Sequence, residues 1–399
     1  MKRLYWYRTI VVCSLFAWPS QGGAADEFSG ADKLRAIYSA EFRFTKSGFP
    51  MVPVAIAEGL GRATITAAPS GSLHLFPEGE GGPDVQGEDS WQVRALATVP
   101  AKLNYWAVVW RGKPGQGPEA EEQIKRWHDR GEKTRRFEQG TVFGVGGEVL
   151  DRRELLVAVG PFGKPEEAEQ SFEALGRKAA LANPGVLSEL IDRPHGQLEA
   201  IGNKTGTRVR NEGVLWFGAG DKTALQVEAE GGTGKAPTRV SGSYYGKVYV
   251  TLDRNGSLAV VNALPEDRLL AGLLPAEIYP NAPEEALKAQ AVAARGELLT
   301  KIGTRHIGDP YRLCSQTHCQ VYSGAGRETP RTTAAVAATR GEVLFTADAK
   351  DLADTVYSAN CGGHTENNEN TWPDMPALAA LRGHRDAPAS GKSDVYAPG

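Results

Sequence analysis

The sequence predicts an α+β protein with more than one domain, and three observations support this prediction. The chain has 399 residues, which is enough for two or three domains of roughly 100–200 residues each. Short segments with alternating apolar residues, typical of strands, recur along the chain. One long segment with helical spacing, residues 284–302, lies in the second half. We therefore expect a mixed β-sheet domain with one long helix, and a smaller α+β module beside it.

Composition narrows the class of protein. The 45 basic and 48 acidic residues give a formal net charge of −3, whereas nucleic-acid-binding proteins normally carry a basic excess. We therefore exclude nucleic acid as a partner. The four cysteines are too few for a disulfide-rich scaffold of this length.

Residues 1–25 are typical of a secretory signal peptide. They have a basic start, an apolar run at 9–18 that is too short for a permanent membrane span, and small residues at 21–25. We expect export to the periplasm or cell envelope, with no transmembrane anchor after cleavage. A permanent N-terminal anchor is the alternative. Cleavage would remove Cys13 and leave three cysteines.

Residues 26–100 are expected to supply strands to the main sheet. Apolar side chains alternate over 52–56 and again over 63–67, with Gly59-Leu60-Gly61 between the two runs. Because glycine favours turns, the pattern predicts two paired strands that are joined at these glycines.

The pattern of residues 101–180 predicts a small module with the element order β-α-β-β-α, which is typical of a ferredoxin-like fold. The strand-like segments are 105–110, 141–149 and 155–159, and the helical segments are 119–127 and 164–175. Residues 181–240 show no clear pattern, and we treat them as a connecting region.

Part of this module resembles a known family. The run Leu155–Phe162, followed by Pro165-Glu166-Glu167-Ala168, is similar to the second half of a SPOR domain. That resemblance implies binding to peptidoglycan glycan strands that have lost their stem peptides. An insertion that only packs against its neighbours is the alternative.

Residues 241–399 form the last predicted region, which begins with a sequence typical of a hairpin. Apolar runs at 244–252 and 258–262 flank Asp253-Arg254-Asn255-Gly256, and Asn-Gly between such runs predicts a β-hairpin.

The helix predicted over 284–302 has one apolar face. That face is formed by Leu287, Ala291, Ala294 and Leu298, so we expect it to be buried. Asn281, just before the segment, is expected to cap its N-terminus.

From Leu258 onward the chain resembles the SpoIID/LytB family of cell-wall proteins. The motifs that carry the resemblance are, in order, Leu273-Leu274-Pro275-Ala276-Glu277-Ile278, the run Glu285–Arg295, Gln320-Val321-Tyr322-Ser323-Gly324, the run Thr339–Leu344, the run Tyr357–Glu366, and Thr371-Trp372. Two features depart from the family. Its helix commonly continues as Arg-Thr-Tyr, where this chain has Arg295-Gly296-Glu297. The chain also ends at Gly399, where many members continue, so it is either a short member or a fragment.

The resemblance implies a lytic transglycosylase with one catalytic carboxyl group, and Glu277 matches the family's catalytic glutamate. Such a group first protonates the glycosidic oxygen and then accepts the proton of the sugar's own 6-hydroxyl group, which closes a 1,6-anhydro ring. Apolar neighbours, including Leu274 and Tyr279, are expected to desolvate Glu277 and raise its pKa, so that it can donate a proton. A helix-terminal glutamate without a chemical role is the alternative.

Polar residues of the matching motifs are candidates for substrate binding. They are Lys288, Gln290, Arg295, Gln320, Tyr322, Ser358, Gly362, Gly363, His364 and Thr365. Glycines 362 and 363 allow positive φ, which lets backbone N–H groups approach a ligand. A solvated helix face explains Lys288 equally well, and core packing explains Tyr322. Trp372 is expected to be a sugar platform or a core residue.

Four further residues suit a metal. His306, Cys314, His318 and Cys319 supply two imidazoles and two thiols within fourteen residues, and these are zinc ligand types. The similar group of some family members favours structural zinc, while a Cys314–Cys319 disulfide and free thiols stay open. No cofactor is required for the expected reaction.

We therefore expect an exported lytic transglycosylase that cleaves the MurNAc–GlcNAc bond of denuded glycan strands. The alternative is a non-catalytic peptidoglycan-binding protein or an amidase enhancer that has cell-wall amidases as partners. A purely structural envelope protein is a third interpretation.

Overall fold

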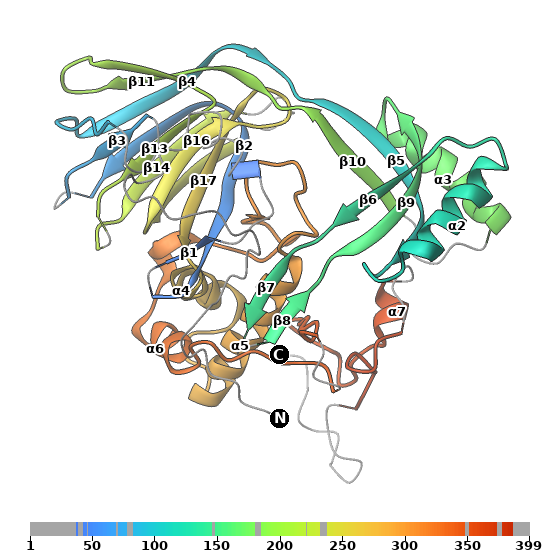
Figure 1. Cartoon of the computed structure of the whole chain (residues 1–399). Coiled ribbons are helices and arrows are strands. Elements are labelled where there is room, and N and C mark those ends of the chain that lie inside the picture. Colours follow the sequence, from blue (N-terminus) through green and yellow to red (C-terminus); the bar gives the residue numbers. More distant parts are fainter. Residues whose placement is uncertain are drawn as a thin grey trace, which may run out of the picture.

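The computed structural model describes residues 37–38, 43–45, 47–68, 71–77, 83–145, 148–179, 185–220, 222–231, 238–347, 351–372 and 377–385. The expected signal peptide, residues 1–25, lies outside these ranges. The described part is a mixed α+β structure rich in strands, as expected (Figure 1).

A large curled sheet forms the centre of the protein. Its main path runs β12-β11-β4-β2-β17-β16-β13-β3, and β1, β14, β15 and β18 pair outside that path. The strands are β1 (Arg43–Phe44), β2 (Pro50–Ala67), β3 (His74–Phe76), β4 (Ser90–Val99), β11 (His195–Gly202), β12 (Arg208–Glu212), β13 (Val214–Gly218), β14 (Leu225–Gly231), β15 (Thr238–Tyr244), β16 (Lys247–Leu252), β17 (Leu258–Pro265) and β18 (Leu313–Cys314).

β2 corrects one sequence expectation, because residues 50–67 form one long strand and not a hairpin. Gly59 has φ +67° and produces an irregular register rather than a turn: β17 residues Leu258 and Val260 oppose Leu60 and Ala57. Three steps along β2 therefore oppose two along β17, which is the definition of a β-bulge.

The hairpin predicted by the Asn-Gly sequence is confirmed. β16 and β17 pair antiparallel from Leu252 and Leu258 outward. Inside the loop, the Asp253 carboxylate accepts hydrogen bonds from the backbone N–H groups of Asn255 (2.8 Å) and Ser257 (3.0 Å). It also accepts one from Gly59 N–H at 2.8 Å, which ties the hairpin loop to the bulge of β2.

The predicted small module is a four-stranded antiparallel sheet of order β10-β5-β9-β6 with two helices. Its elements are β5 (Lys102–Gly112), α2 (Gly117–His128), β6 (Thr134–Gln139), β9 (Glu154–Phe162), α3 (Pro165–Ala179) and β10 (Gly185–Asp192), and a separate hairpin pairs β7 (Val142–Val145) with β8 (Glu148–Asp151). Taken in chain order, the four strands have the ferredoxin-like arrangement 4-1-3-2. Its relation to SPOR domains stays a prediction.

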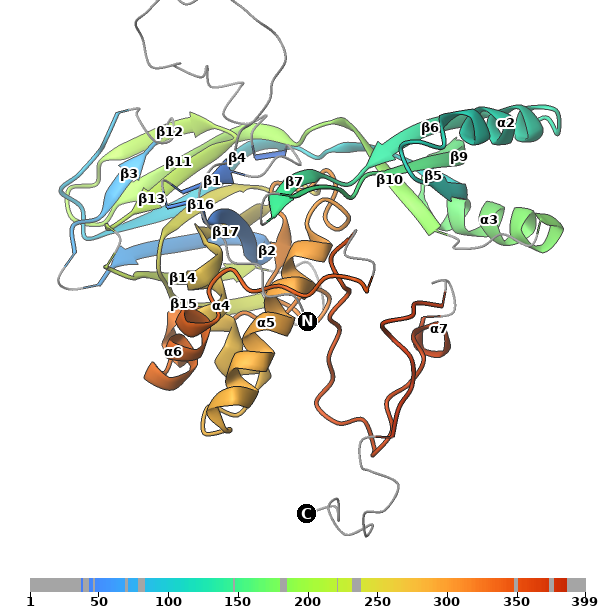
Figure 2. The same ribbon diagram turned by 60° about the horizontal axis from the view of Figure 1, so that its bottom comes forward.

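The region treated as a connection, 181–240, belongs to both sheets. β10 completes the module, whereas β11 to β14 join the large sheet. The module is therefore an insertion between two neighbouring strands, because β4 leads into β5 and β10 leads back into β11. In Figures 1 and 2 the module projects from the ends of β4 and β11.

α4 (Glu266–Glu277) packs against β2 and β17, and α5 (Glu284–Lys301) and α6 (Pro330–Ala338) pack against α4 and against each other (Figure 2). A short 3₁₀ helix (Gly324–Arg327) and α7 (Asn368–Thr371) complete the described elements.

The four apolar residues predicted to share the face of α5 are all buried. The prediction that Asn281 caps α5 is wrong. The N-cap residue is Pro283, which makes no side-chain hydrogen bond. The Asn281 amide donates to the Tyr279 hydroxyl at 3.3 Å. None of the described helices combines the length and apolar character needed to span a membrane.

Arg295 corrects another expectation, since it lies in the interior and not on a sugar-binding surface. Its side chain is 2% exposed and pairs with the equally buried Glu266 at 2.6 Å. The guanidinium also donates to the carbonyl oxygens of Thr339 (2.8 Å) and Glu342 (3.0 Å). One side chain thereby joins α4, α5 and the segment after α6.

Replacing Arg295 should strongly destabilise the fold. The change Arg295→Met would leave the Glu266 carboxylate buried without its partner, at a cost of about 3–5 kcal/mol in the free energy of unfolding. Urea unfolding of the purified protein measures this.

The double change Glu266→Met/Arg295→Met should recover most of that loss, because no buried charge remains. Lys288→Met is the matched control on the same helix, since Lys288 pairs only with Glu284 and Glu285 at the surface. A loss for Arg295→Met no larger than for this control would contradict the structural role of the buried pair.

Candidate active site

A cleft of about 1140 Å³ lies between the inserted module and the helical side of the large sheet. Glu277, the last residue of α4, is part of its lining, and we call the cavity the Glu277 cleft. The module contributes Arg111, Gly112, Lys113, Gln116, Arg152 and Glu154; α5 and the residues after it contribute Glu297, Thr300, Lys301, Thr304 and Arg305; the remaining walls are residues 317–321, 346–347, 351–352, 354, 356–357, Trp372 and 378–381.

Glu277 is held at the cleft wall by one backbone hydrogen bond. Val321 N–H donates to its Oε1 at 2.9 Å, which orients the half-buried carboxyl group. The predicted apolar surroundings form on one side only: Leu274 is fully buried, but Tyr279 is 71% exposed. The arrangement can present the carboxyl group to a polymer that lies along the open cleft.

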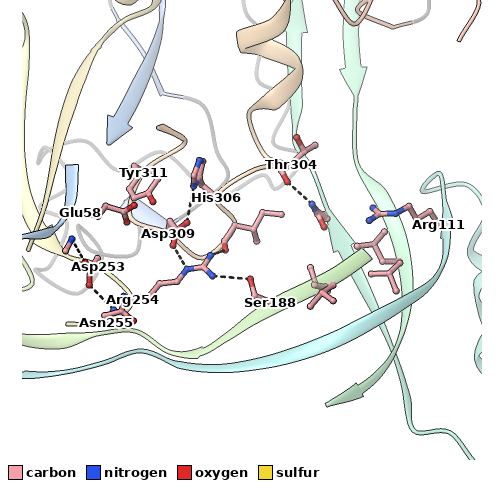
Figure 3. A pocket seen from close by; sticks show the side chains of 17 residues that line it. Glu58, Arg111, Ser188, Asp253, Arg254, Asn255, Thr304, His306, Asp309 and Tyr311 are labelled. Atoms are coloured by element: carbon pink, nitrogen blue, oxygen red, sulfur yellow. Dashed lines mark hydrogen bonds and ion pairs between the residues drawn. The ribbon is translucent and has the colours of Figure 1, made fainter. Parts of the chain in front are cut away.

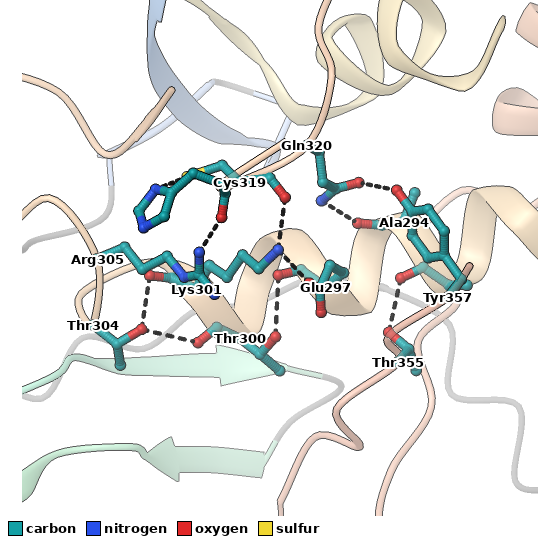
Figure 4. A network of polar contacts seen from close by, with 12 residues as sticks. Ala294, Glu297, Thr300, Lys301, Thr304, Arg305, Cys319, Gln320, Thr355 and Tyr357 are labelled. Atoms are coloured by element: carbon teal, nitrogen blue, oxygen red, sulfur yellow. Dashed lines mark hydrogen bonds and ion pairs between the residues drawn. The ribbon is translucent and has the colours of Figure 1, made fainter. Parts of the chain in front are cut away.

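Gln320 and Tyr322 flank Val321 and are both buried. Gln320 lines the Glu277 cleft, so its role as a sugar contact stays a prediction, whereas Tyr322 lies outside the cleft lining, as expected of a core residue. The Gln320 amide donates to Ala294 O (3.1 Å), and its oxygen accepts from the Tyr357 hydroxyl (3.0 Å; Figure 4). The Tyr322 hydroxyl donates to Asn262 Oδ1 at 2.7 Å. The bonds of its side chain fix Gln320, the residue before Val321, against α5.

Tyr357 lies in the lining of the Glu277 cleft. Burial, together with the nearby carboxylates of Glu277 and Glu297, raises the pKa of its phenol well above the usual value. Its hydroxyl group therefore keeps its proton at physiological pH and donates it to Gln320.

Lys288 and Gln290 do not line the Glu277 cleft. Lys288 pairs with Glu284 (2.7 Å) and Glu285 (2.8 Å), as expected of a solvated helix face. The Gln290 side-chain nitrogen is buried and lacks a hydrogen-bond partner among the described residues.

The Gly-Gly turn has the predicted conformation but lies outside the cleft lining. Gly362 and Gly363 have φ of +66° and +87°. Ser358 and Thr365 are exposed, and the His364 ring contacts Thr365 O at 2.6 Å. Trp372 does line the cleft and is 41% exposed, which supports a platform in place of a core role.

The four predicted metal ligands come together. One ligand atom each of His306, Cys314, His318 and Cys319 lies within 4.8 Å of the others. Cys319 Sγ is 3.3 Å from His306 Nε2, and Cys314 Sγ is 3.8 Å from His318 Nδ1. Ligands of a tetrahedral zinc ion are roughly 3.3–3.8 Å apart, so this set fits zinc. Both cysteines are free thiols here, not a disulfide.

The outer surroundings also suit a metal. Asp309 Oδ2 lies 3.2 Å from His306 Nδ1, which leaves Nε2 facing the thiols, as is usual for metal-bound histidine. Cys319 directly precedes Gln320, and its carbonyl oxygen accepts from Lys301 at 2.6 Å. The His/Cys group therefore anchors the segment whose Val321 holds Glu277.

A second cavity, of about 840 Å³, has His306 of this group in its lining (Figure 3). Arg254 from the hairpin loop reaches across it to Asp309, to Ile307 O (2.8 Å) and to Ser188 of β10 (3.4 Å). Burial raises the pKa of Glu58, which also lines it. Arg254 thus joins the module to the large sheet and to the loop that carries His306.

Sequence reasoning missed several cleft residues. Arg111 and Arg152 come from the inserted module, and no local pattern indicates that it faces Glu277. Asp354 and Glu297 also line the cleft. For Glu297 a signal existed, since it stands at the departure from the family's helix motif.

Residues 254–345 match the family described as stage II sporulation protein, SpoIID. This segment is therefore similar to the SpoIID family. It contains Glu277, the whole His/Cys group and the Gln320-Val321-Tyr322 segment, whereas the Gly-Gly turn follows it.

Two curated proteins are similar to this chain. An uncharacterised protein of Brachyspira hyodysenteriae is 34% identical over 172 residues, which is 43% of either chain. The amidase enhancer of Bacillus subtilis is 36% identical over 118 residues, 29% of this chain and 15% of the enhancer. The matches thus span less than half of either relative. No solved structure gives a significant match.

Proposed function

We propose that this protein is an exported peptidoglycan lytic transglycosylase in which Glu277 is the single general acid and base. The observation that carries the proposal is the position of Glu277 inside the segment that matches SpoIID, at the wall of a cleft of about 1140 Å³, with Val321 N–H fixing one carboxyl oxygen. The expected signal peptide supports export. The name of the amidase enhancer supports action on the cell wall.

In this reaction one carboxyl group acts first as a proton donor and then as a proton acceptor. Glu277 donates its proton to the glycosidic oxygen as the bond to the anomeric carbon of MurNAc breaks. The resulting carboxylate accepts the proton of the 6-hydroxyl group of the same sugar, whose oxygen attacks the anomeric carbon and forms the 1,6-anhydro ring. No second, nucleophilic carboxylate is required, in contrast to two-carboxylate glycosidases.

The inserted module contributes one wall of the cleft, so a glycan strand in the cleft would touch both parts of the protein. If the module binds denuded strands, as the SPOR resemblance implies, it raises the effective concentration of substrate at Glu277. The exposed Trp372 ring is suited to stacking on a sugar.

The change Glu277→Gln tests the catalytic role. The amide can still accept from Val321 N–H but cannot transfer a proton, so we expect cleavage to fall by about 10²–10⁴-fold. Mass analysis of denuded glycan strands after incubation measures the 1,6-anhydroMurNAc ends. Glu285→Gln, at an exposed position of α5, is the control. Formation of anhydro ends by Glu277→Gln at the control rate would remove Glu277 from the catalytic role.

We further propose that the His/Cys group holds one structural zinc ion. The ion would fix the loop before Gln320, because the thiols lie on both ends of that loop. Metal analysis of the purified full chain should give about one zinc per chain, and Cys314→Ser should lose it and lower the melting temperature. An equal melting temperature with and without chelator, together with a disulfide in mass analysis, would contradict the zinc site.

The second candidate is an amidase enhancer, favoured by the name of the Bacillus subtilis relative. In that case the protein would bind glycan strands and stimulate a cell-wall amidase without making anhydro ends. Adding Glu277→Gln to an amidase assay separates the two functions: stimulation by this variant without any cleavage by the wild type supports the enhancer.

A further inference from the structure

Glu297 is a buried carboxylate with one unsatisfied oxygen. It lies on α5 in the lining of the Glu277 cleft, and its side chain is 9% exposed. Its Oε1 pairs with Lys301 one turn further along the helix (Figure 4). Its Oε2 is buried and has no hydrogen-bond partner among the described residues. A buried carboxylate oxygen without a donor is costly, so this atom requires an explanation.

Asp354 provides one. Asp354 lines the same cleft, and its neighbour Thr355 donates to Ala293 O, one turn before Glu297 on α5, which brings the two carboxyl groups together. Burial, followed by the Glu297 charge, raises the pKa of Asp354 to about 6, against the lowering effect of Arg152 and Lys301. Two carboxyl groups in contact cannot both ionise easily, and one proton between them satisfies both.

The charged groups near the Glu297–Asp354 pair have partners of their own or lie in the same cleft lining. Arg152 of the module is bound to Asp351 at 2.6 Å, and Lys301 also donates to Cys319 O. Glu277 and the phenol of Tyr357 lie in the same cleft lining. Lys301 therefore balances one negative charge of the pair, and the shared proton removes the second.

A continuous line of contacts connects this pair to Glu277. Thr355, which follows Asp354, donates to Ala293 O of α5 at 2.8 Å. Gly296 makes that approach possible, because a Cβ atom there would lie 2.3 Å from Thr355 Oγ1. Tyr357 then donates to Gln320, the residue before the Val321 whose N–H holds Glu277.

We propose that Glu297 and Asp354 share one proton, and that this proton fastens residues 354–357 to α5 and so positions Glu277 for glycan cleavage. The positioning step rests on the proposed function, whereas the shared proton does not. Gly296 and Glu297 are adjacent, so both features of this contact, the close approach of Thr355 and the buried carboxylate, lie at one point of the helix.

The sign of the pH effect follows from the raised pKa. The folded protein holds the Asp354 proton more tightly than the unfolded chain does, where the pKa is near 3.8. Stability should therefore fall as the pH rises from about 4 to about 6, and stay lower above that range. Loss of the proton leaves two facing carboxylates, so the support of Glu277 should weaken over the upper part of this range.

The variants Glu297→Gln and Asp354→Asn test the proposal, because either amide supplies a permanent N–H donor in the same shape. The full chain is compared with both variants from pH 4.5 to 8, by melting temperature and by the initial rate of anhydro-end formation. The wild type should lose melting temperature and rate as the pH rises through about 6. Both variants should lose that decline. The rate at pH 7.5 divided by the rate at pH 5.5 should then be roughly tenfold higher for each variant than for the wild type.

Glu285→Gln is the control, since Glu285 is an exposed carboxylate of the same helix that pairs with Lys288 and lies outside the cleft lining. It should keep the wild-type decline. A decline in melting temperature that persists in both amide variants would overturn the shared proton. If the two amide variants lose the decline in melting temperature but keep the wild-type dependence of the rate on pH, the positioning role is overturned. Absence of anhydro ends at every pH would reject the proposed function, and the melting data would still decide the shared proton.

Discussion

The geometry of the Glu277 cleft depends on one buried guanidinium. Arg295 joins α4 to α5 through Glu266, and it holds the segment after α6 through two carbonyl oxygens. Because Glu277 is the last residue of α4 and Glu297 lies two residues beyond Arg295, any shift between the two helices would move both carboxyl groups. The surrounding supports, Gln320 and Thr355, are also bound to α5 backbone carbonyls. The long helix is thus the common reference for every part of the cleft wall on this side.

Much of the local structure could be predicted from the sequence, because short-range rules decide it. The Asn-Gly hairpin and the buried face of α5 follow from turn chemistry and periodicity. The glycine pair near residue 60 shows the limit of such rules. A turn and a β-bulge both use a glycine with positive φ, and only the partner strand, some 200 residues later in the chain, decides between them.

The candidate site was predicted in part for the same reason. Glu277 and the four His/Cys residues come from compact motifs, and the structure brings those four together. Arg295 was misassigned because its partner, Glu266, lies 29 residues earlier in the chain, and a charged helix residue gives no sign of a buried pair. The contribution of the module to the cleft depends on the direction in which an inserted domain projects, which no local pattern specifies.

The strand β2 has a consequence for how the chain reaches its native state. Its neighbours in the sheet include β14, β17 and β18, all of which follow the inserted module in the chain. Contacts this distant in sequence form slowly, because a long loop must be closed first. The module's four strands, by contrast, all lie within residues 102–192. During synthesis the insertion can therefore fold before β14, β17 and β18 pair with β2. In that interval the β2 edges that these later strands cover in the native sheet are unpaired, and unpaired apolar edges of this kind favour aggregation of the nascent chain.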